Sequence, residues 1–176
     1  MIARMDKTLA ATALAAALLT GLTACSNGTS NSGSSSSQKP SATASKPLTA
    51  STAFAAISGK VSSAKRSGTV TAENDPNHLL GRPNQYTSKV TFTDSRIKAA
   101  DVTGTEKGDV ERGGAIEVFG GPADAAARAK YIQAVTKSMP ALTEYDYVHG
   151  TVVIRVSHYL TPAQAASYKT AAAHLS

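Results

Sequence analysis

The chain of 176 residues contains a single cysteine, Cys25. A domain that follows it has no partner for a disulfide and must be stabilised by its own apolar core. Residues 51–176 make up 126 residues, a common size for one domain and enough to bury such a core. They carry 14 Lys and Arg against 11 Asp and Glu, a net charge of +3, with no basic cluster interleaved with aromatic residues. Nucleic acid is therefore a poor candidate for a partner.

The first 24 residues have the pattern of a secretory signal peptide. Arg4 and Lys7 precede an uncharged apolar run, which ends in Leu-Thr-Ala-Cys at residues 22–25. The run is only as long as the shortest membrane spans, which need ~17–25 residues, and Ala, Gly and Thr dilute it. The last four residues match the lipobox of bacterial lipoproteins, in which the cysteine becomes the new N-terminus and carries a diacylglycerol thioether. We predict a lipoprotein signal peptide over residues 1–24 and lipid attachment at Cys25.

Residues 25–50 have the composition of a tether. After Cys25 they are almost wholly Ser, Thr, Gly, Asn, Ala and Pro, which cannot bury enough apolar surface to offset the entropy of ordering. Flexible-chain statistics give such a segment a reach of ~25–30 Å. Two or three acyl chains on the cysteine, such as diacylglycerol and palmitate, form a stable anchor. We therefore expect a domain tethered to the cell membrane on its extracytoplasmic face.

Three segments have helix patterns, each with apolar residues at helical spacing on one face. The first covers residues 51–61, with Ser51 as a possible N-cap. The second starts at Pro122 and the third at Pro162, and proline is favoured at the first helical position. Thr161 opens a capping box for the third helix.

Alternating apolar and polar residues predict strands. Val90 and Phe92 share one face of the first strand, and the opposite face, with Lys89, is expected to be solvated. Ile116 and Val118 face together in the second strand. A hairpin with a His149–Gly150 turn is expected to form the last two strands, with three cross-strand pairs. These pairs are Tyr147 with Val152, Tyr145 with Ile154, and Glu144 with Arg155.

The order of these elements predicts an α+β class. We expect one small domain over residues 51–176, with about four mostly antiparallel strands and two to three helices packed on one face. The helix between the second and third strands either makes a crossover or an antiparallel return, and spacing alone leaves both open.

The stretch ENDPNHLLGRPNQY, next to the first predicted strand, has two interpretations. In the first, Asp75 caps a single helical turn that Gly81 ends in the left-handed conformation. In the second, Asn77, Arg82 and Tyr86 present a polar face to a ligand or a partner protein. In this interpretation the guanidinium of Arg82 donates two parallel hydrogen bonds to a carboxylate or phosphate.

The sequence contains no recognisable catalytic motif. It lacks the G-x-S-x-G of a serine hydrolase, and its histidines, at positions 78, 149, 158 and 174, stand singly without metal-ligand spacing. We assign no catalytic residue, no metal and no cofactor.

Two groups of acidic residues can be interpreted either as functional sites or as ordinary solvated charges. A loop with Asp101, Glu106, Asp109 and Glu111 can hold calcium weakly or be simply solvated. Glu117 with Glu144 or Asp146 can act as an acid and base pair, or these residues can be ordinary charges on strand surfaces.

Several stretches resemble small secreted lipoproteins of high-GC Gram-positive (actinobacterial-type) bacteria. The resemblance rests on the lipobox, on DPNHLLGRPNQYTSKVTFTDSR, on ERGGAIEVF with ARAKYI, and on YDYVHGTVVIRVSHYLTPAQAASY, and it covers residues 51–175. It implies attachment of Cys25 to the outer face of the cytoplasmic membrane and lends no catalytic residue.

Together these features predict a membrane-anchored extracytoplasmic lipoprotein whose domain binds an envelope protein or a cell-wall component. The alternative is an envelope hydrolase that uses a carboxylate pair. A deep cleft with two convergent carboxylates of raised pKa favours the enzyme, and a shallow surface favours the binding domain. The oligomeric state stays open.

Overall fold

The computed structural model describes residues 47–176. Cys25, the predicted signal peptide and residues 25–46 of the predicted tether lie outside the described residues. Within residues 47–176, every helix is too short or too polar to cross a membrane.

A single five-stranded sheet forms the middle of the domain, and all of its neighbouring strands are antiparallel in the order β1-β2-β3-β5-β4. The strands are β1 (Ala64–Thr69), β2 (Tyr86–Asp94), β3 (Gly113–Phe119), β4 (Glu144–His149) and β5 (Val152–Ser157). The helices are α1 (Ala50–Ser58), α2 (Pro122–Ser138) and α3 (Pro162–Ala172). Three short 3-10 turns are η1 (Ala99–Val102), η2 (Val110–Arg112) and η3 (Pro140–Leu142).

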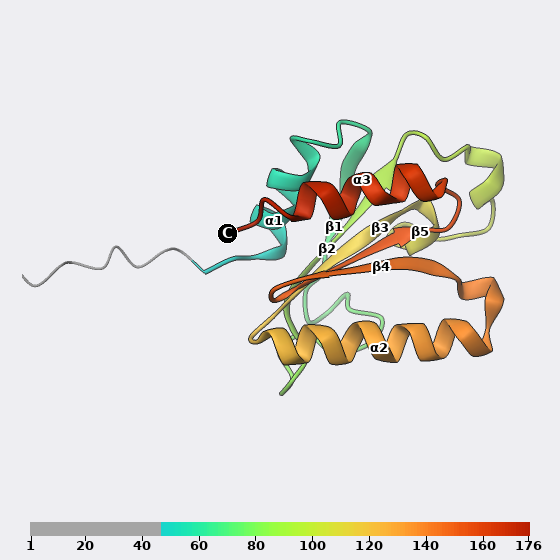
Figure 1. Ribbon diagram of the computed structural model, residues 1–176. Coiled ribbons are helices and arrows are strands. Elements are labelled where there is room, and N and C mark those ends of the chain that lie inside the picture. Colours follow the sequence, from blue (N-terminus) through green and yellow to red (C-terminus); the bar gives the residue numbers. More distant parts are fainter. Residues whose placement is uncertain (1–46) are drawn as a thin grey trace, which may run out of the picture. The chain divides into compact units, whose positions relative to one another are not determined.

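The helices lie on both faces of the sheet. α1 and α3 cover one face and α2 covers the other (Figure 1). The predicted α+β class is confirmed, with five antiparallel strands and three helices. The structure adds β1, and it corrects the expectation that the helices share one face. The physical reason is that β3 and β5 carry apolar residues on their second face as well, where Phe119 and Val153 form a cluster with Ala129 of α2.

The face covered by α1 and α3 holds the larger apolar core. Phe92 stacks on Tyr168 of α3 with ring centroids 5.2 Å apart, and it lies 5.8 Å from the ring of Phe54 in α1. Gly114 lies opposite Phe92, and an added Cβ there would meet the phenyl ring at 2.5 Å and the carbonyl oxygen of Arg155 at 2.1 Å. A glycine at this position thus lets the ring and the neighbouring strand pack closely.

The domain begins slightly before the predicted boundary at Ser51. Thr49, not Ser51, is the N-cap of α1, and it forms a capping box with Thr52. Ala50 is fully buried, and Leu48 packs against the core. The starts of α2 and α3 are as predicted, and Thr161 forms the expected capping box.

The predicted hairpin forms with its register shifted by two residues. The turn is Gly150–Thr151, because His149 pairs with Val152. Tyr145 and Tyr147 still share a face, but they lie opposite Val156 and Ile154. The predicted turn at His149–Gly150 is wrong. Gly150 has the left-handed conformation (φ 54°) that the first position of such a two-residue turn requires, so the turn starts at Gly150 and not at His149.

The connection through α2 is a crossover. β3 and β4 are each antiparallel to β5, which lies between them, so they run in the same direction. The helix therefore carries the chain across one face of the sheet, over β3, β5 and β4. β1 and β2 extend beyond the part of this face that α2 contacts.

Candidate functional site

A fully buried carboxylate lies in the middle of the face that α2 covers. The side chain of Glu117 is 0% exposed and contacts three cations. Lys89 Nζ lies 3.0 Å from Oε1, Arg128 Nε donates to Oε2 at 2.9 Å, and Arg155 NH1 lies 3.4 Å from Oε1. These three cations are themselves only 6%, 10% and 16% exposed.

The sheet register brings these charges together. Lys89 on β2 is the direct cross-strand partner of Glu117 on β3. Arg155 on β5 pairs with Ala115, two residues before Glu117, so it reaches the carboxylate diagonally. Arg128 comes from α2, three residues after the buried Ala125 and directly before the buried Ala129. We call Lys89, Glu117, Arg128 and Arg155 the charge cluster.

Two further carboxyl groups, those of Glu144 and Asp146 on β4, lie next to Arg155 of β5. Glu144 accepts two hydrogen bonds from its guanidinium, at 2.6 Å from Nε and 2.8 Å from NH2. The predicted Glu144–Arg155 ion pair is thus present, although the residue directly opposite Arg155 is Asp146. Asp146 Oδ1 is buried and has no hydrogen-bond partner among the described residues.

The environment moves the pKa values of these acids in opposite directions. Burial favours the neutral form of Glu117, but the charges of Lys89, Arg155 and Arg128 outweigh it and hold the pKa below its ordinary 4.5. Burial, with a shared hydrogen bond and the charge of Glu144, raises the pKa of Asp146 to about 8. At neutral pH Glu117 is ionised and Asp146 is mostly protonated.

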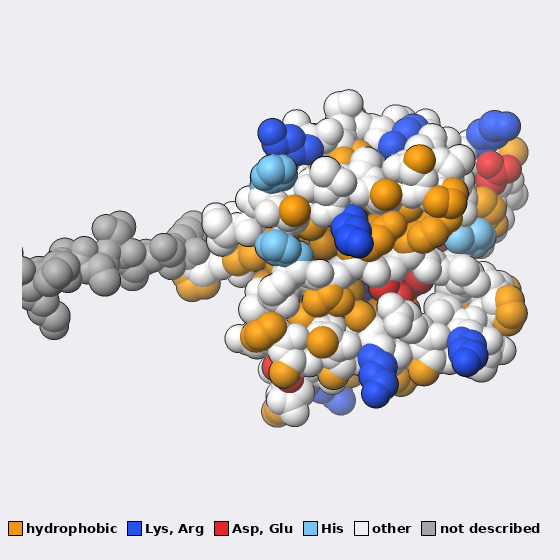
Figure 2. Space-filling view, viewed as in Figure 1, with side chains coloured by type: hydrophobic (Ala, Val, Ile, Leu, Met, Phe, Trp, Pro, Cys, Tyr) orange, Lys and Arg blue, Asp and Glu red, His pale blue; other side chains and the backbone are white. Residues whose placement is uncertain are grey.

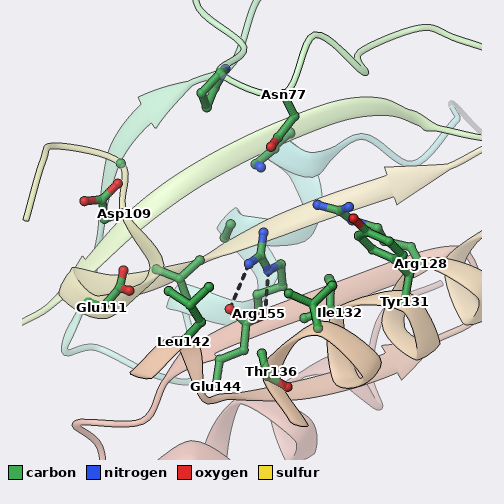
Figure 3. Close-up of a pocket in the computed structure, with 16 residues that line it drawn as sticks. Asn77, Asp109, Glu111, Arg128, Tyr131, Ile132, Thr136, Leu142, Glu144 and Arg155 are labelled. Atoms are coloured by element: carbon green, nitrogen blue, oxygen red, sulfur yellow. Dashed lines mark hydrogen bonds and ion pairs between the residues drawn. The ribbon is translucent and has the colours of Figure 1, made fainter. Parts of the chain in front are cut away.

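The charge cluster opens into a cavity. This central cavity measures about 350 Å³ and is lined by Lys89, Arg128 and Arg155, by Asn77 of the β1–β2 loop, and by residues of the loop before β3. The view of its lining residues shows Asn77, Arg128 and Arg155 pointing toward the same space from a loop, a helix and a strand (Figure 3). Asp109 and Glu111 lie on another side of this space.

Two neighbouring cavities continue the hollow. One, of about 380 Å³, lies beside β1 and shares Lys89 and Asp109 with the central cavity. The other, of about 560 Å³, lies by the β1–β2 loop and shares Asn77, Arg128 and Tyr131 with it. We call the three cavities together the groove. Ligand pockets typically measure ~300–1,000 Å³, so each of the three cavities has the size of a binding site.

The β1–β2 loop wraps around a buried carboxylate. Asp75 accepts hydrogen bonds from the backbone amides of Asn77, Leu79 and Leu80 and from the hydroxyl of Tyr86. Burial opposes ionisation of Asp75, but the hydrogen bonds of Tyr86 and of these amides outweigh it and lower the pKa. Gly81 is left-handed as predicted, at φ 76°. The predicted helical turn is replaced by an irregular turn with left-handed His78, because the amides converge on one carboxylate.

The structure separates the three residues predicted to bind a ligand. Asn77 is exposed and lines the groove. Arg82 is exposed and does not line these cavities. Tyr86 is fully buried, with its hydroxyl engaged by Asp75, so its position is structural.

Two other expectations change. The face of β2 expected to be solvated carries Lys89 and Thr91, which are both buried. Glu117 has two interpretations from the sequence, one half of an acid and base pair or an ordinary charge on a strand surface. In the structure it is fully buried among cations, and its pKa is lowered. Asp109 and Glu111 of the acidic loop belong to the wall of the central cavity, where Asp109 also accepts a hydrogen bond from the amide of Glu106.

The charge cluster differs from the face shown in Figure 2 in how its cations are arranged. In the space-filling view, Lys and Arg side chains lie singly over the face shown (Figure 2). The charge cluster, by contrast, brings three cations to one carboxylate.

Sequence reasoning missed the charge cluster, although a signal is present. Val153 and Phe119 sit on the same face as Lys89 and Glu117, and apolar residues on both faces of β3 and β5 indicate a doubly covered sheet. Charges in the middle of such strands are buried. The sequence does not indicate that Arg128 reaches them from α2.

Comparisons with known proteins do not identify a relative. No protein-family model, curated protein or solved structure matches the chain.

Asp146 provides a test of the site's electrostatics. Its pKa is raised from 3.8 to about 8, so the folded state holds the proton more tightly than the unfolded state. The free energy of unfolding therefore decreases as pH rises between these values. We expect Asp146→Asn to stabilise the protein at pH 8 by at least about 1 kcal/mol, since one pKa unit corresponds to about 1.4 kcal/mol, with no gain below pH 4.

The measurement is thermal or urea unfolding of the full chain at pH 4 and pH 8. Asp101→Asn, at an exposed position, is the control and is expected to change stability little at either pH. A stability change in Asp146→Asn that is the same at both pH values would contradict the assignment.

Proposed function

We propose that the protein is a lipid-anchored extracytoplasmic binding domain whose groove receives a component of the cell envelope. The observation that supports this most is the charge cluster at the floor of the groove. The lipobox and the tether composition support the location, and they rest on the sequence alone.

The energetics of the cluster favour a binding role over a purely stabilising one. Each buried ion loses hydration, and an ion pair inside a protein is often no more stabilising than apolar residues of similar volume. The neighbouring positions Ala115, Val153 and Phe119 show that this face accepts apolar side chains. Three cations around one carboxylate at the floor of an open cavity are better explained by a ligand that contacts them.

The carboxyl groups fit a hydrolase less well. A carboxylate pair for acid and base chemistry needs both groups at the reacting bond. Glu117 is held ionised by its three partners, and Glu144 is bound on both oxygens by Arg155. Asp146 has the raised pKa of an acid, but it does not line the central cavity.

The anchor is tested by mass spectrometry of the membrane fraction. We expect the N-terminal peptide of the mature protein to start at Cys25 and to carry a lipid adduct. Cys25→Ala removes the thiol that carries the lipid, so this variant is expected to lose the adduct and its membrane attachment. Wild-type protein without an adduct would contradict the proposed location.

The groove is tested by crosslinking in intact cells. Tyr131 is 62% exposed and lines two of the three cavities, so Tyr131→Ala removes contact surface without disturbing the core. We expect it to reduce crosslinked partners at least about threefold, as truncation of an aromatic residue in a binding site commonly costs over 1 kcal/mol.

Two substitutions outside the groove serve as controls. Tyr159 is 42% exposed and follows β5, and Arg82 is exposed on the β1–β2 loop. Tyr159→Ala and Arg82→Ala are expected to leave the partners unchanged. An unchanged set of partners in Tyr131→Ala, with folding intact, would refute a role of the groove.

A further inference from the structure

We infer that the groove binds a ligand through a single carboxylate group, held between Lys89 and Arg128, and that the ligand is a short peptide with a free C-terminus. This inference rests on the proposed function and specifies the chemistry of its ligand.

Lys89 and Arg128 have hydrogen-bond donors without an acceptor among the described residues, and Lys89 Nζ also lies over the Tyr86 ring, 5.1 Å from its centroid. An ammonium group has three N–H donors, and the contacts within residues 47–176 give Lys89 one acceptor, Glu117. Arg128 uses Nε and NH2 on Glu117, which leaves NH1 without a partner in the described part of the chain. Both residues line the central cavity, so these donors are available to an acceptor that enters it.

Each of the three guanidinium nitrogens of Arg155, by contrast, already has an acceptor within the charge cluster or on Glu144. Its Nε and NH2 donate to both oxygens of Glu144, and its NH1 donates to Glu117. The remaining binding capacity therefore lies between Lys89 and Arg128. Asn77 adds an amide above this space, since it lines the same cavity and points into it (Figure 3).

The charge balance selects a monoanion. Lys89, Arg128 and Arg155 carry three positive charges, while Glu117 and Glu144 carry two negative ones. Asp146 is mostly protonated at neutral pH, so the floor of the groove keeps one positive charge. One carboxylate neutralises this charge, and a carboxylate accepts hydrogen bonds from Lys and Arg at good geometry. A phosphate dianion carries more negative charge than this single positive charge can neutralise.

The opposite wall favours an ammonium group on the same ligand. Asp109 and Glu111 line the cavity away from Arg128, and they repel additional negative charge. The same cavity is also lined by Ile132, Val135 and Leu142, which offer apolar contact. A peptide of a few residues has this arrangement of charges, with an anionic C-terminus and a cationic N-terminus joined by a less polar body.

The direct test is calorimetric titration of the full chain, purified from membranes in detergent, with four probes. These are trialanine, trialanine C-terminal amide, N-acetyl-trialanine and inorganic phosphate. We expect trialanine to bind and its amide to bind at least about tenfold more weakly, because hydrogen bonds to a charged group contribute about 1.5–3 kcal/mol. Acetylation is expected to weaken binding about threefold or more, since attraction between charges near a surface is modest.

Variants locate the binding position. Lys89→Met keeps the apolar stem and removes the ammonium, so it is expected to weaken trialanine binding at least about tenfold. Lys130→Met, on an exposed position of α2, is the matched control and is expected to bind as the wild type. If Lys89→Met fails to fold, Arg128→Lys retains a charge beside Glu117 and removes NH1, and it is expected to weaken binding about threefold or more.

The outcomes separate this inference from the proposed function. Equal binding of trialanine and its amide, no binding of trialanine, or phosphate binding as tight as trialanine binding would overturn the carboxylate inference. If Tyr131→Ala still loses its crosslinked partners in that case, the groove binds an envelope component through other chemistry. If the crosslinked partners also stay unchanged, both proposals are refuted.

Discussion

The buried carboxylate of Glu117 organises this face of the sheet. It sits in the middle strand, it is 0% exposed, and it is ionised only because Lys89, Arg128 and Arg155 surround it. Removing one partner from such a cluster leaves an uncompensated charge, which is strongly destabilising, whereas an apolar replacement of the whole cluster costs little. The positions of β2, β3, β5 and α2 relative to one another are therefore tied to one carboxylate.

The crossover through α2 determines where this cluster meets solvent. The helix covers β3, β5 and β4, so it closes one side of the cluster, while the loops on either side of β2 form the other walls of the groove. The opposite face, packed by α1 and α3, contains the apolar core that stabilises the domain without a disulfide. One face thus provides stability, and the other face presents charged groups in a cavity.

Much of this fold follows from local patterns in the sequence. The starts of α2 and α3, the left-handed Gly81 and the β4–β5 hairpin are visible in capping residues, glycine and alternation. The hairpin register was missed by two residues because His149–Gly150 and Gly150–Thr151 are both acceptable two-residue turns. β1 was missed because AKRSGT has no apolar alternation and forms a largely exposed edge strand.

The candidate site depends on tertiary contacts, and sequence reasoning reached only part of it. Asn77 of the β1–β2 loop lines the groove as its loop position suggests, but Tyr86, from the same stretch, is buried in an apolar cluster and donates a hydrogen bond to Asp75. In the sequence, Lys89 and Glu117 have the pattern of solvated charges on strands. They are buried because α2 covers this face of the sheet. Charge alone does not show whether a strand residue faces water, because this depends on which face a distant helix covers.

The ionisation of Glu117 is the most direct test of this account. Its side-chain carboxyl carbon can be followed by NMR in the full chain as the pH is lowered. We predict that the carboxylate remains largely ionised at pH 4.5, and that the stability it contributes is lost as pH falls below 4.5 through its lower folded pKa. A midpoint at or above 4.5 would mean that the three cations do not hold it, and would contradict the account.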